Sequence, residues 1–101
     1  PGLDAFVVCL DENGLATAFR LLQELRSQGV SSDMNFRLGS MKSQMRQADK
    51  TKARFVLILG EEELKNGQVA LKDMQQGAQE TFRLDDVGRI VSKIQENKLK
   101  K

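Results

Sequence analysis

Three consecutive glutamates at positions 61–63 follow an apolar run, Phe55–Leu59, and a glycine, Gly60. An uninterrupted apolar run of this length is typical of a strand that is covered on both faces. Carboxylates directly after the strand suit the positive end of a helix dipole, which is a purely structural role. They also stand where the carboxyl ends of parallel strands open a crevice for a ligand. From the residues alone, Glu61 can serve either purpose.

Basic side chains are concentrated in residues 37–54. This segment holds six Lys and Arg residues against a single acid, Asp49, although the whole chain carries a net charge of only +2. Lys42, Arg46 and Lys50 are spaced four residues apart, which places them on one face of a helix. A concentrated basic face is the pattern expected of a phosphate-binding surface, and a solvated helix face is the alternative.

Several kinds of catalytic chemistry lack their residues in this chain. It has no histidine, so an imidazole base and histidine metal ligands are both excluded. The glycine-rich loops that cradle phosphates are also absent. Adjacent glutamates on a helix point in different directions and make a poor metal cage. The one cysteine, Cys9, has no histidine to activate it and is interpreted as a small core residue. We therefore expect no catalytic residues and no metal site.

Length and composition predict one domain over residues 1–101, with a mass of 11.3 kDa. Its apolar runs are far shorter than the roughly 20 residues needed to cross a bilayer, so we expect no transmembrane segment. No secretory leader is recognised in the sequence. The single cysteine cannot form an internal disulfide, which fits a reducing compartment such as the cytoplasm.

Hydrophobic periodicity predicts alternating strands and helices in the first half of the chain and a hairpin in the second. The expected strands are residues 3–10, 30–36, Phe55–Leu59, Gln68–Asp73 and 78–83. The first expected helix covers residues 14–28, with Phe19 in its apolar stripe. The second begins at a capping Ser40, with Met41 and Met45 as core filling. A short helix follows Gly60, and a last helix begins at residues 84–86.

Connection lengths decide the predicted topology. Strand, helix, strand, helix, strand gives three parallel strands through right-handed crossovers. Only eight residues lie between Leu59 and Gln68, fewer than a parallel crossover requires, so the fourth strand should be antiparallel. The predicted fold is a three-layer α/β domain, with a five-stranded mixed sheet of order 2-1-3-4-5 and helices on both faces. A ligand would sit between strands one and three, at their carboxyl ends.

Four sequence blocks resemble the C-terminal anticodon-binding domain of histidyl-tRNA synthetase. They are ADK at 48–50, ARFVLILGEEEL at 53–64, NG at 66–67 and VALKD at 69–73. The resemblance extends to the opening strand at 4–8 and covers nearly the whole chain. Related domains of the threonyl, prolyl and glycyl synthetases share this fold and a similar Gly-Glu turn. The resemblance implies that residues 1–101 are an excised domain of a larger ligase of protein biosynthesis, which attaches histidine to tRNA using ATP.

The resemblance also implies partners and a binding site. The partners are a tRNA anticodon stem-loop and the catalytic domain of the parent chain, which holds the ATP and Mg²⁺ sites and forms a homodimer; no cofactor is expected in this fragment and no membrane partner. Unstacked anticodon bases are read on their edges and stacked upon. Glu61 would accept hydrogen bonds from a guanine edge, and Lys72 would contact a base or phosphate. The side chains expected to meet backbone phosphates are Lys42, Arg46 and Arg37.

Two further questions stay open at the level of sequence. Phe36, near the carboxyl end of the second strand, can either stack on a base or fill the core. The domain could instead be a protein-interaction or regulatory module of a synthetase-like paralogue that does not charge tRNA. A small-ligand sensor in the sheet crevice is a weaker alternative, because no phosphate-cradling glycine loop is present.

Overall fold

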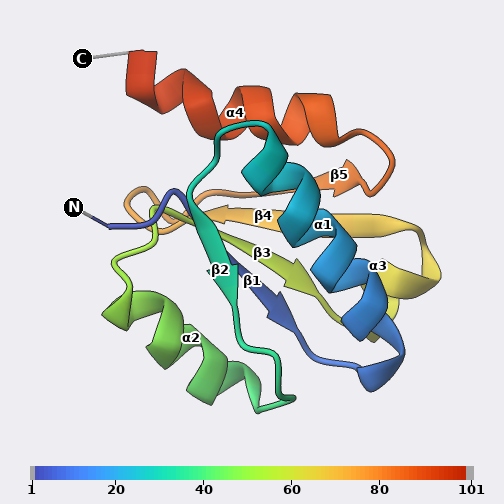
Figure 1. Ribbon diagram of the computed structural model, residues 1–101. Coiled ribbons are helices and arrows are strands. Elements are labelled where there is room, and N and C mark those ends of the chain that lie inside the picture. Colours follow the sequence, from blue (N-terminus) through green and yellow to red (C-terminus); the bar gives the residue numbers. More distant parts are fainter. Residues whose placement is uncertain (1, 100–101) are drawn as a thin grey trace.

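A computed structural model describes residues 2–99 and consists of one mixed sheet with helices on both faces (Figure 1). The five strands are β1 (Ala5–Cys9), β2 (Ser32–Met34), β3 (Phe55–Leu59), β4 (Gln68–Asp73) and β5 (Gln79–Arg83). Their order is β2-β1-β3-β4-β5; β1 is parallel to β2 and β3, and β4 is antiparallel to β3 and β5. The predicted order and directions are confirmed.

The helices divide between the two faces of the sheet. They are a 3₁₀ turn η1 (Glu12–Gly14), α1 (Leu15–Ser27), α2 (Met41–Lys50), α3 (Glu61–Lys65) and α4 (Val87–Leu99). α1 and α4 lie together on one face, whereas α2 lies alone on the other (Figure 1). The short α3 follows β3 at the end of the sheet where β1 and β3 both end, which we call the carboxyl edge.

Each face of the sheet has its own hydrophobic cluster, because successive strand residues point to opposite sides. In β3, Leu57 and Leu59 belong to the larger cluster beneath α1 and α4, and Val56 and Ile58 belong to a smaller one beneath α2. Cys9 lies in the larger cluster and is 1% exposed, as expected of a core residue. The α2 face is thus the thinly covered face of the domain.

β2 is shorter than the strand expected at residues 30–36. The Asp33 side chain accepts a hydrogen bond from the backbone N–H of Met34 at 2.8 Å, and the Asn35 side chain accepts one from Arg37 at 3.2 Å. Such local side-chain bonds compete with ladder pairing and favour a turn. Phe36 therefore lies in a bend beyond β2 rather than in the strand.

The buried stripe of α2 differs from the predicted one. Met41 is 38% exposed and Met45 is half-buried, whereas Gln44 and Ala48 are 0% and 1% exposed. The interpretation of Met41 as core filling was wrong, because the helix turns a polar residue, Gln44, towards the sheet. Ser40 caps the helix as predicted and accepts a hydrogen bond from the N–H of Ser43 at 3.0 Å.

Membrane spans and metal sites each require a particular arrangement of residues. Within residues 2–99, no helix is long and apolar enough to cross a membrane. The same part of the chain contains no group of three or more acidic or cysteine side chains placed to hold a metal ion.

Candidate nucleic-acid interface

The side chain of Gln44 fastens α2 to the carboxyl edge. The β1–β2 ladder ends at the pair Val7 and Met34, so the outward backbone groups of Cys9 have no strand partner on that side. Gln44 Nε2 donates to the carbonyl of Cys9 at 2.7 Å, and Gln44 Oε1 accepts from its N–H at 3.2 Å. The same Nε2 donates to the carbonyl of Gly39 at 2.9 Å. The side-chain amide thus takes the place of a longer β2.

The basic face of α2 begins at this edge. Lys42 lies in the first turn and Arg46 one turn further on, and both side chains are exposed. Arg37 is exposed in the connection that leads into the helix. Since α2 runs back towards the start of β3, Lys50 lies at the opposite end of the helix. Cationic side chains therefore line the length of α2 from the carboxyl edge.

Glu61 presents a carboxylate that is not engaged within the described chain. Glu63 Oε1 accepts a hydrogen bond from the backbone N–H of Gly60 at 2.9 Å, so Glu63 supplies the cap of α3. Glu61 is exposed, and its side chain makes no hydrogen bond or ion pair with the residues whose side chains the structure describes. Its position at the start of α3 still suits the helix dipole. The hydrogen-bonded capping role belongs to Glu63, and the Glu61 carboxylate can accept from a ligand.

Continuous backbone contacts connect the start of α2 with Glu61. Gln44 bonds Cys9, and the N–H of the next residue, Leu10, donates to the carbonyl of Leu59 at 2.9 Å. Gly60 and Glu61 follow Leu59 directly. The unpaired carboxylate and the first cationic turn of α2 therefore occupy the same edge of the sheet.

Lys72 lies away from that edge. It stands on β4 opposite Val56 of β3, on the face of the sheet that carries α2. Val56 precedes Gly60 by four positions, which at a rise of about 3.3 Å per residue separates Lys72 from the start of α3 by about 13 Å. A ligand that contacts both Lys72 and Glu61 must therefore extend along the strand.

The sheet beyond α2 offers a polar surface that the sequence reasoning did not single out. The strand register places Gln79, Thr81 and Arg83 of β5 on the same face as Gln68 and Lys72 of β4. Among the described residues, no helix packs over these side chains, and the three on β5 are exposed. The alternation of polar residues along β5, with Phe82 turned to the other face, is the signal that could have identified this surface.

One basic residue of segment 37–54 has a structural role instead. Arg54 Nε and Nη2 donate to the two carboxylate oxygens of Asp73 at 3.0 and 3.1 Å. The Arg54 hydrogen bonds, opposed by partial burial and supported by the N–H groups of Gln75 and Gln76, hold the pKa of the Asp73 carboxyl below its usual value. The pair ties the start of β3 to the end of β4, at the opposite end from Glu61.

Phe36 is exposed and contacts a second exposed ring. It is 56% exposed, and its centroid lies 5.9 Å from that of Phe19 in α1, which is 44% exposed; the two rings are tilted by 60°. This excludes the core role considered for Phe36, and the placement of Phe19 in the buried stripe was wrong. The exposed large apolar side chains form what we call the edge apolar patch: Leu10, Phe19, Phe36, Leu38 and Met41.

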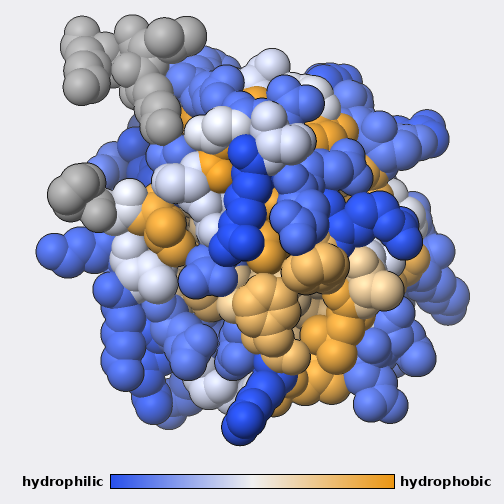
Figure 2. Space-filling view, in the orientation of Figure 1, coloured by the Kyte–Doolittle hydropathy of each residue, from blue (hydrophilic) through white to orange (hydrophobic). Residues whose placement is uncertain are grey.

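The edge apolar patch lies where β1 and β2 end and α2 begins. Figure 2 shows apolar side chains gathered on the face that carries the connection between β2 and α2 beside α1. Leu10 also lies beside Gly60, since a Cβ built at Gly60 would come within 3.7 Å of Leu10 Cδ1. The patch, the start of the basic α2 face and Glu61 therefore lie at the same edge of the sheet.

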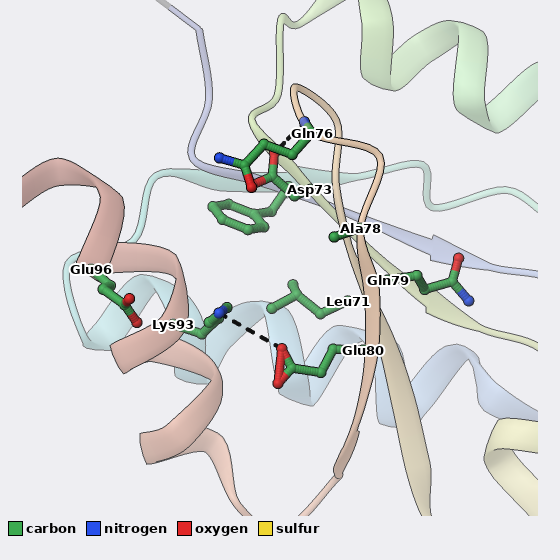
Figure 3. A pocket seen from close by; sticks show the side chains of 9 residues that line it. Leu71, Asp73, Gln76, Ala78, Gln79, Glu80, Lys93 and Glu96 are labelled. Carbon is green, nitrogen blue, oxygen red and sulfur yellow. Dashed lines mark hydrogen bonds and ion pairs between the residues drawn. The ribbon is translucent and has the colours of Figure 1, made fainter. Parts of the chain in front are cut away.

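A hollow at the other end of the sheet has different chemistry. It lies between the β4–β5 hairpin and α4 (Figure 3). Asp73 on its wall is paired with Arg54, and Lys93 Nζ lies 3.8 Å from Glu80 Oε2. Leu71 and Phe55 form its apolar floor. Since these charges already have partners, we do not include the hollow in the interface.

Comparison with known proteins decides the family. A family model described as an anticodon binding domain matches residues 4–94. The chain belongs to the anticodon-binding domain family. The histidine–tRNA ligase of Elusimicrobium minutum is 42% identical to this domain over 89 residues, which is 88% of the chain and 22% of the ligase. The histidine–tRNA ligase of Bacillus subtilis is 39% identical over 85 residues, 84% of the chain and 20% of the ligase.

Solved histidyl-tRNA synthetases contain a domain with the same fold as this chain. The domain aligns with apo histidyl-tRNA synthetase of S. aureus at a TM-score of 0.77 and 32% identity, over 94% of this chain and 23% of that one. It aligns with histidyl-tRNA synthetase of Nostoc sp. PCC 7120 at 0.81 and 27%, over 96% and 22%. The RNA binding domain of threonyl-tRNA synthetase from Cryptosporidium parvum shares the fold, with a TM-score of 0.78 at 20% identity over 91% and 22%. The domain thus spans about a fifth of the histidine relatives it matches.

Proposed function

We propose that this domain binds the anticodon loop of histidine tRNA, as the C-terminal domain of a histidyl-tRNA synthetase that attaches histidine to tRNA using ATP. The family supports RNA binding, and the identities to histidine–tRNA ligases support the histidine enzyme. The observation that carries the proposal is the carboxyl edge, where the unengaged carboxylate of Glu61 adjoins the cationic start of α2. Carboxylates accept from base edges, and cations neutralise phosphates.

The proposed roles follow the positions of the side chains. Glu61 accepts hydrogen bonds from a guanine edge at the tip of the loop. Lys42, Arg46 and Arg37 contact backbone phosphates, adding affinity without reading sequence. Lys72, about 13 Å further along β3 and β4, contacts a base or phosphate of a neighbouring nucleotide. The amide and hydroxyl groups of the β4–β5 face lie along the path between these two contacts.

The remainder of the proposed enzyme lies outside this chain. The domain spans about a fifth of the length of these relatives. The proposal assigns the ATP and Mg²⁺ sites to a separate catalytic domain of the parent. On the resemblance alone, the proposal includes a homodimeric parent in the cytoplasm. The domain itself is assigned no cofactor and no catalytic step.

The test measures binding of the 101-residue chain to an anticodon stem-loop of histidine tRNA, and to the same stem with altered loop sequences. We expect weak binding that prefers the histidine loop and weakens as salt rises. Glu61→Gln replaces one acceptor oxygen by a donor without changing size and should abolish the preference. Glu62→Gln makes the same change at an exposed neighbour and serves as the control.

Two results would contradict the proposal. Equal affinity for unrelated hairpins would reduce the binding to nonspecific electrostatics. Loss of the preference for the histidine loop in Glu62→Gln rather than in Glu61→Gln would show that Glu62, and not Glu61, reads the base. Unfolding midpoints of both variants should match the parent chain, because neither side chain is hydrogen-bonded within residues 2–99.

A further inference from the structure

The two exposed phenylalanines are unusual within this chain. It has five phenylalanines and neither tryptophan nor tyrosine. Phe6 and Phe55 are each 2% exposed, and Phe82 is half-buried against the larger core cluster. Only Phe19 and Phe36 are exposed, and they contact each other although they come from separate elements. The fold therefore brings its only two exposed aromatic rings to one place.

The arrangement of the two rings leaves apolar faces open to solvent. Their centroids are 5.9 Å apart and their planes are tilted by 60°, so the rings form an angled surface rather than a parallel stack. Phe19 is held on α1, whereas Phe36 lies in the bend after β2 and is the more exposed ring. A flat ligand can lie on one ring while its edge meets the other.

The charges around the rings favour nucleic acid over an apolar protein segment. Arg37 follows Phe36 directly, is exposed and makes no ion pair with the residues whose side chains the structure describes. Arg20 follows Phe19 in α1 but lies beside Glu24 and Leu84, away from the ring pair. The basic face of α2 begins four residues after Leu38. An exposed aromatic face beside a guanidinium group and a basic helix suits an unstacked base and its phosphate. A purely apolar partner would leave these cations without partners at its margin.

We propose that Phe19 and Phe36 form a stacking platform for one unstacked base of the bound loop. The proposal rests on the proposed function and adds a subsite to it. Phe36 supplies the stacking face, and Phe19 supports the Phe36 ring and contacts the edge of the base. Because every base has a π-face, this subsite contributes affinity and fixes the path of the loop, while Glu61 supplies the reading of sequence.

The test uses anticodon stem-loops that carry the fluorescent base 2-aminopurine at one loop position at a time. Stacking quenches this fluorophore, so the 101-residue chain should quench one loop position strongly. Phe36→Leu keeps the site apolar but removes the ring. It should abolish that quenching and weaken binding about fivefold or more. Phe36→Tyr should retain both, and Phe19→Leu should lower them by less than Phe36→Leu.

A matched control separates the rings from general apolarity. Leu38→Ala removes apolar area from the same patch without removing a ring, so it should leave the quenching intact. The unfolding midpoints of all variants should stay close to that of the parent chain, because each substituted side chain is substantially exposed.

The outcomes distinguish the platform from the proposed function. If Phe36→Leu binds and quenches like the parent while Glu61→Gln still loses its preference, the platform is overturned and anticodon binding stands. If no stem-loop binds specifically, the proposed function and the platform both fail. If the phenylalanine variants keep RNA affinity but lose association with a separately produced catalytic part of the synthetase, the patch is a protein interface and the platform is overturned.

Discussion

Replacement of Gln44 by methionine tests how α2 is held to the sheet. Methionine has a similar length, so the substitution removes the amide without leaving a large cavity. It removes the partners of Cys9 N–H and Cys9 C=O, in a position where Gln44 is 0% exposed. The third bond, to Gly39, is partly exposed, and water can replace it.

The expected loss follows from the two orphaned backbone groups. Each buried group left without a partner costs about 1 to 3 kcal/mol, so the two together should lower the free energy of unfolding of Gln44→Met by about 2 to 6 kcal/mol. This is a large share of the roughly 5 to 15 kcal/mol that stabilises a domain. With a urea m-value of about 2 kcal/mol/M, the unfolding midpoint should fall by about 1 to 3 M.

The assay is urea unfolding followed by circular dichroism, with Gln47→Met as the control. Gln47 is exposed on the same helix, so the same substitution there should change stability by less than about 0.5 kcal/mol. If the two variants unfold at the same midpoint with the same m-value, the Gln44 amide does not hold α2 to β1. The basic face of α2 would then not be fixed at the carboxyl edge by Gln44.

Gln44→Glu adds a pH test at the same position. An ionised carboxylate would face the carbonyl oxygens of Cys9 and Gly39, to which Gln44 now donates. The folded state should therefore favour the protonated acid and raise the pKa of this glutamate above its unfolded value of about 4.3. A raised folded pKa gives stability that is present below the unfolded value and is lost as pH rises. The penalty of Gln44→Glu relative to the parent should be larger at pH 7 than at pH 4, and equal penalties would contradict this hydrogen-bond geometry.

Three further predictions concern other parts of the domain. The lowered pKa of Asp73, caused chiefly by Arg54, gives stability that is present above about pH 3.9 and is lost as pH falls through the folded pKa, so Asp73→Asn should flatten acid unfolding below pH 4 as followed by circular dichroism. Gly67 has φ of +66°, so Gly67→Ala should cost about 1 kcal/mol in urea unfolding, whereas Gly88→Ala within α4 should stabilise by about 0.5 to 1 kcal/mol. Lys42→Ala should weaken binding of all hairpins alike and lower the slope of log affinity against log salt by up to about 1.

The topology was predictable because it depends on connection lengths, which are local. Only eight residues separate Leu59 from Gln68, and that number alone forces β4 to run against β3. Apolar runs that are buried on both faces likewise identify β1 and β3 without tertiary information. The Asn-Gly pair at 66–67 is typical of a turn, and Gly67 has the positive φ that such a turn requires between α3 and β4.

The errors arose where a tertiary partner decides the environment of a side chain. Met41 matches helical spacing as well as Gln44 does, and the unpaired backbone groups of Cys9 make burial of the polar residue favourable. Phe19 matches the apolar stripe of α1, yet it lies just outside the buried arc and contacts Phe36 instead. Periodicity identifies a helix, but it does not fix the orientation of the helix to within one residue.

The shortness of β2 connects these features. Because Asp33 and Asn35 end the strand early, the chain bends at Phe36, and that bend brings the ring to α1. The same early end leaves Cys9 unpaired on its outer side, which gives Gln44 a place to bind and fixes the first turn of α2 beside β1. A β2 extended to residue 36 would pair with the end of β1, displace Gln44 and withdraw Phe36 into the ladder. The exposed rings, the basic helix face and the carboxylate of Glu61 therefore share one edge because one strand stops after three residues.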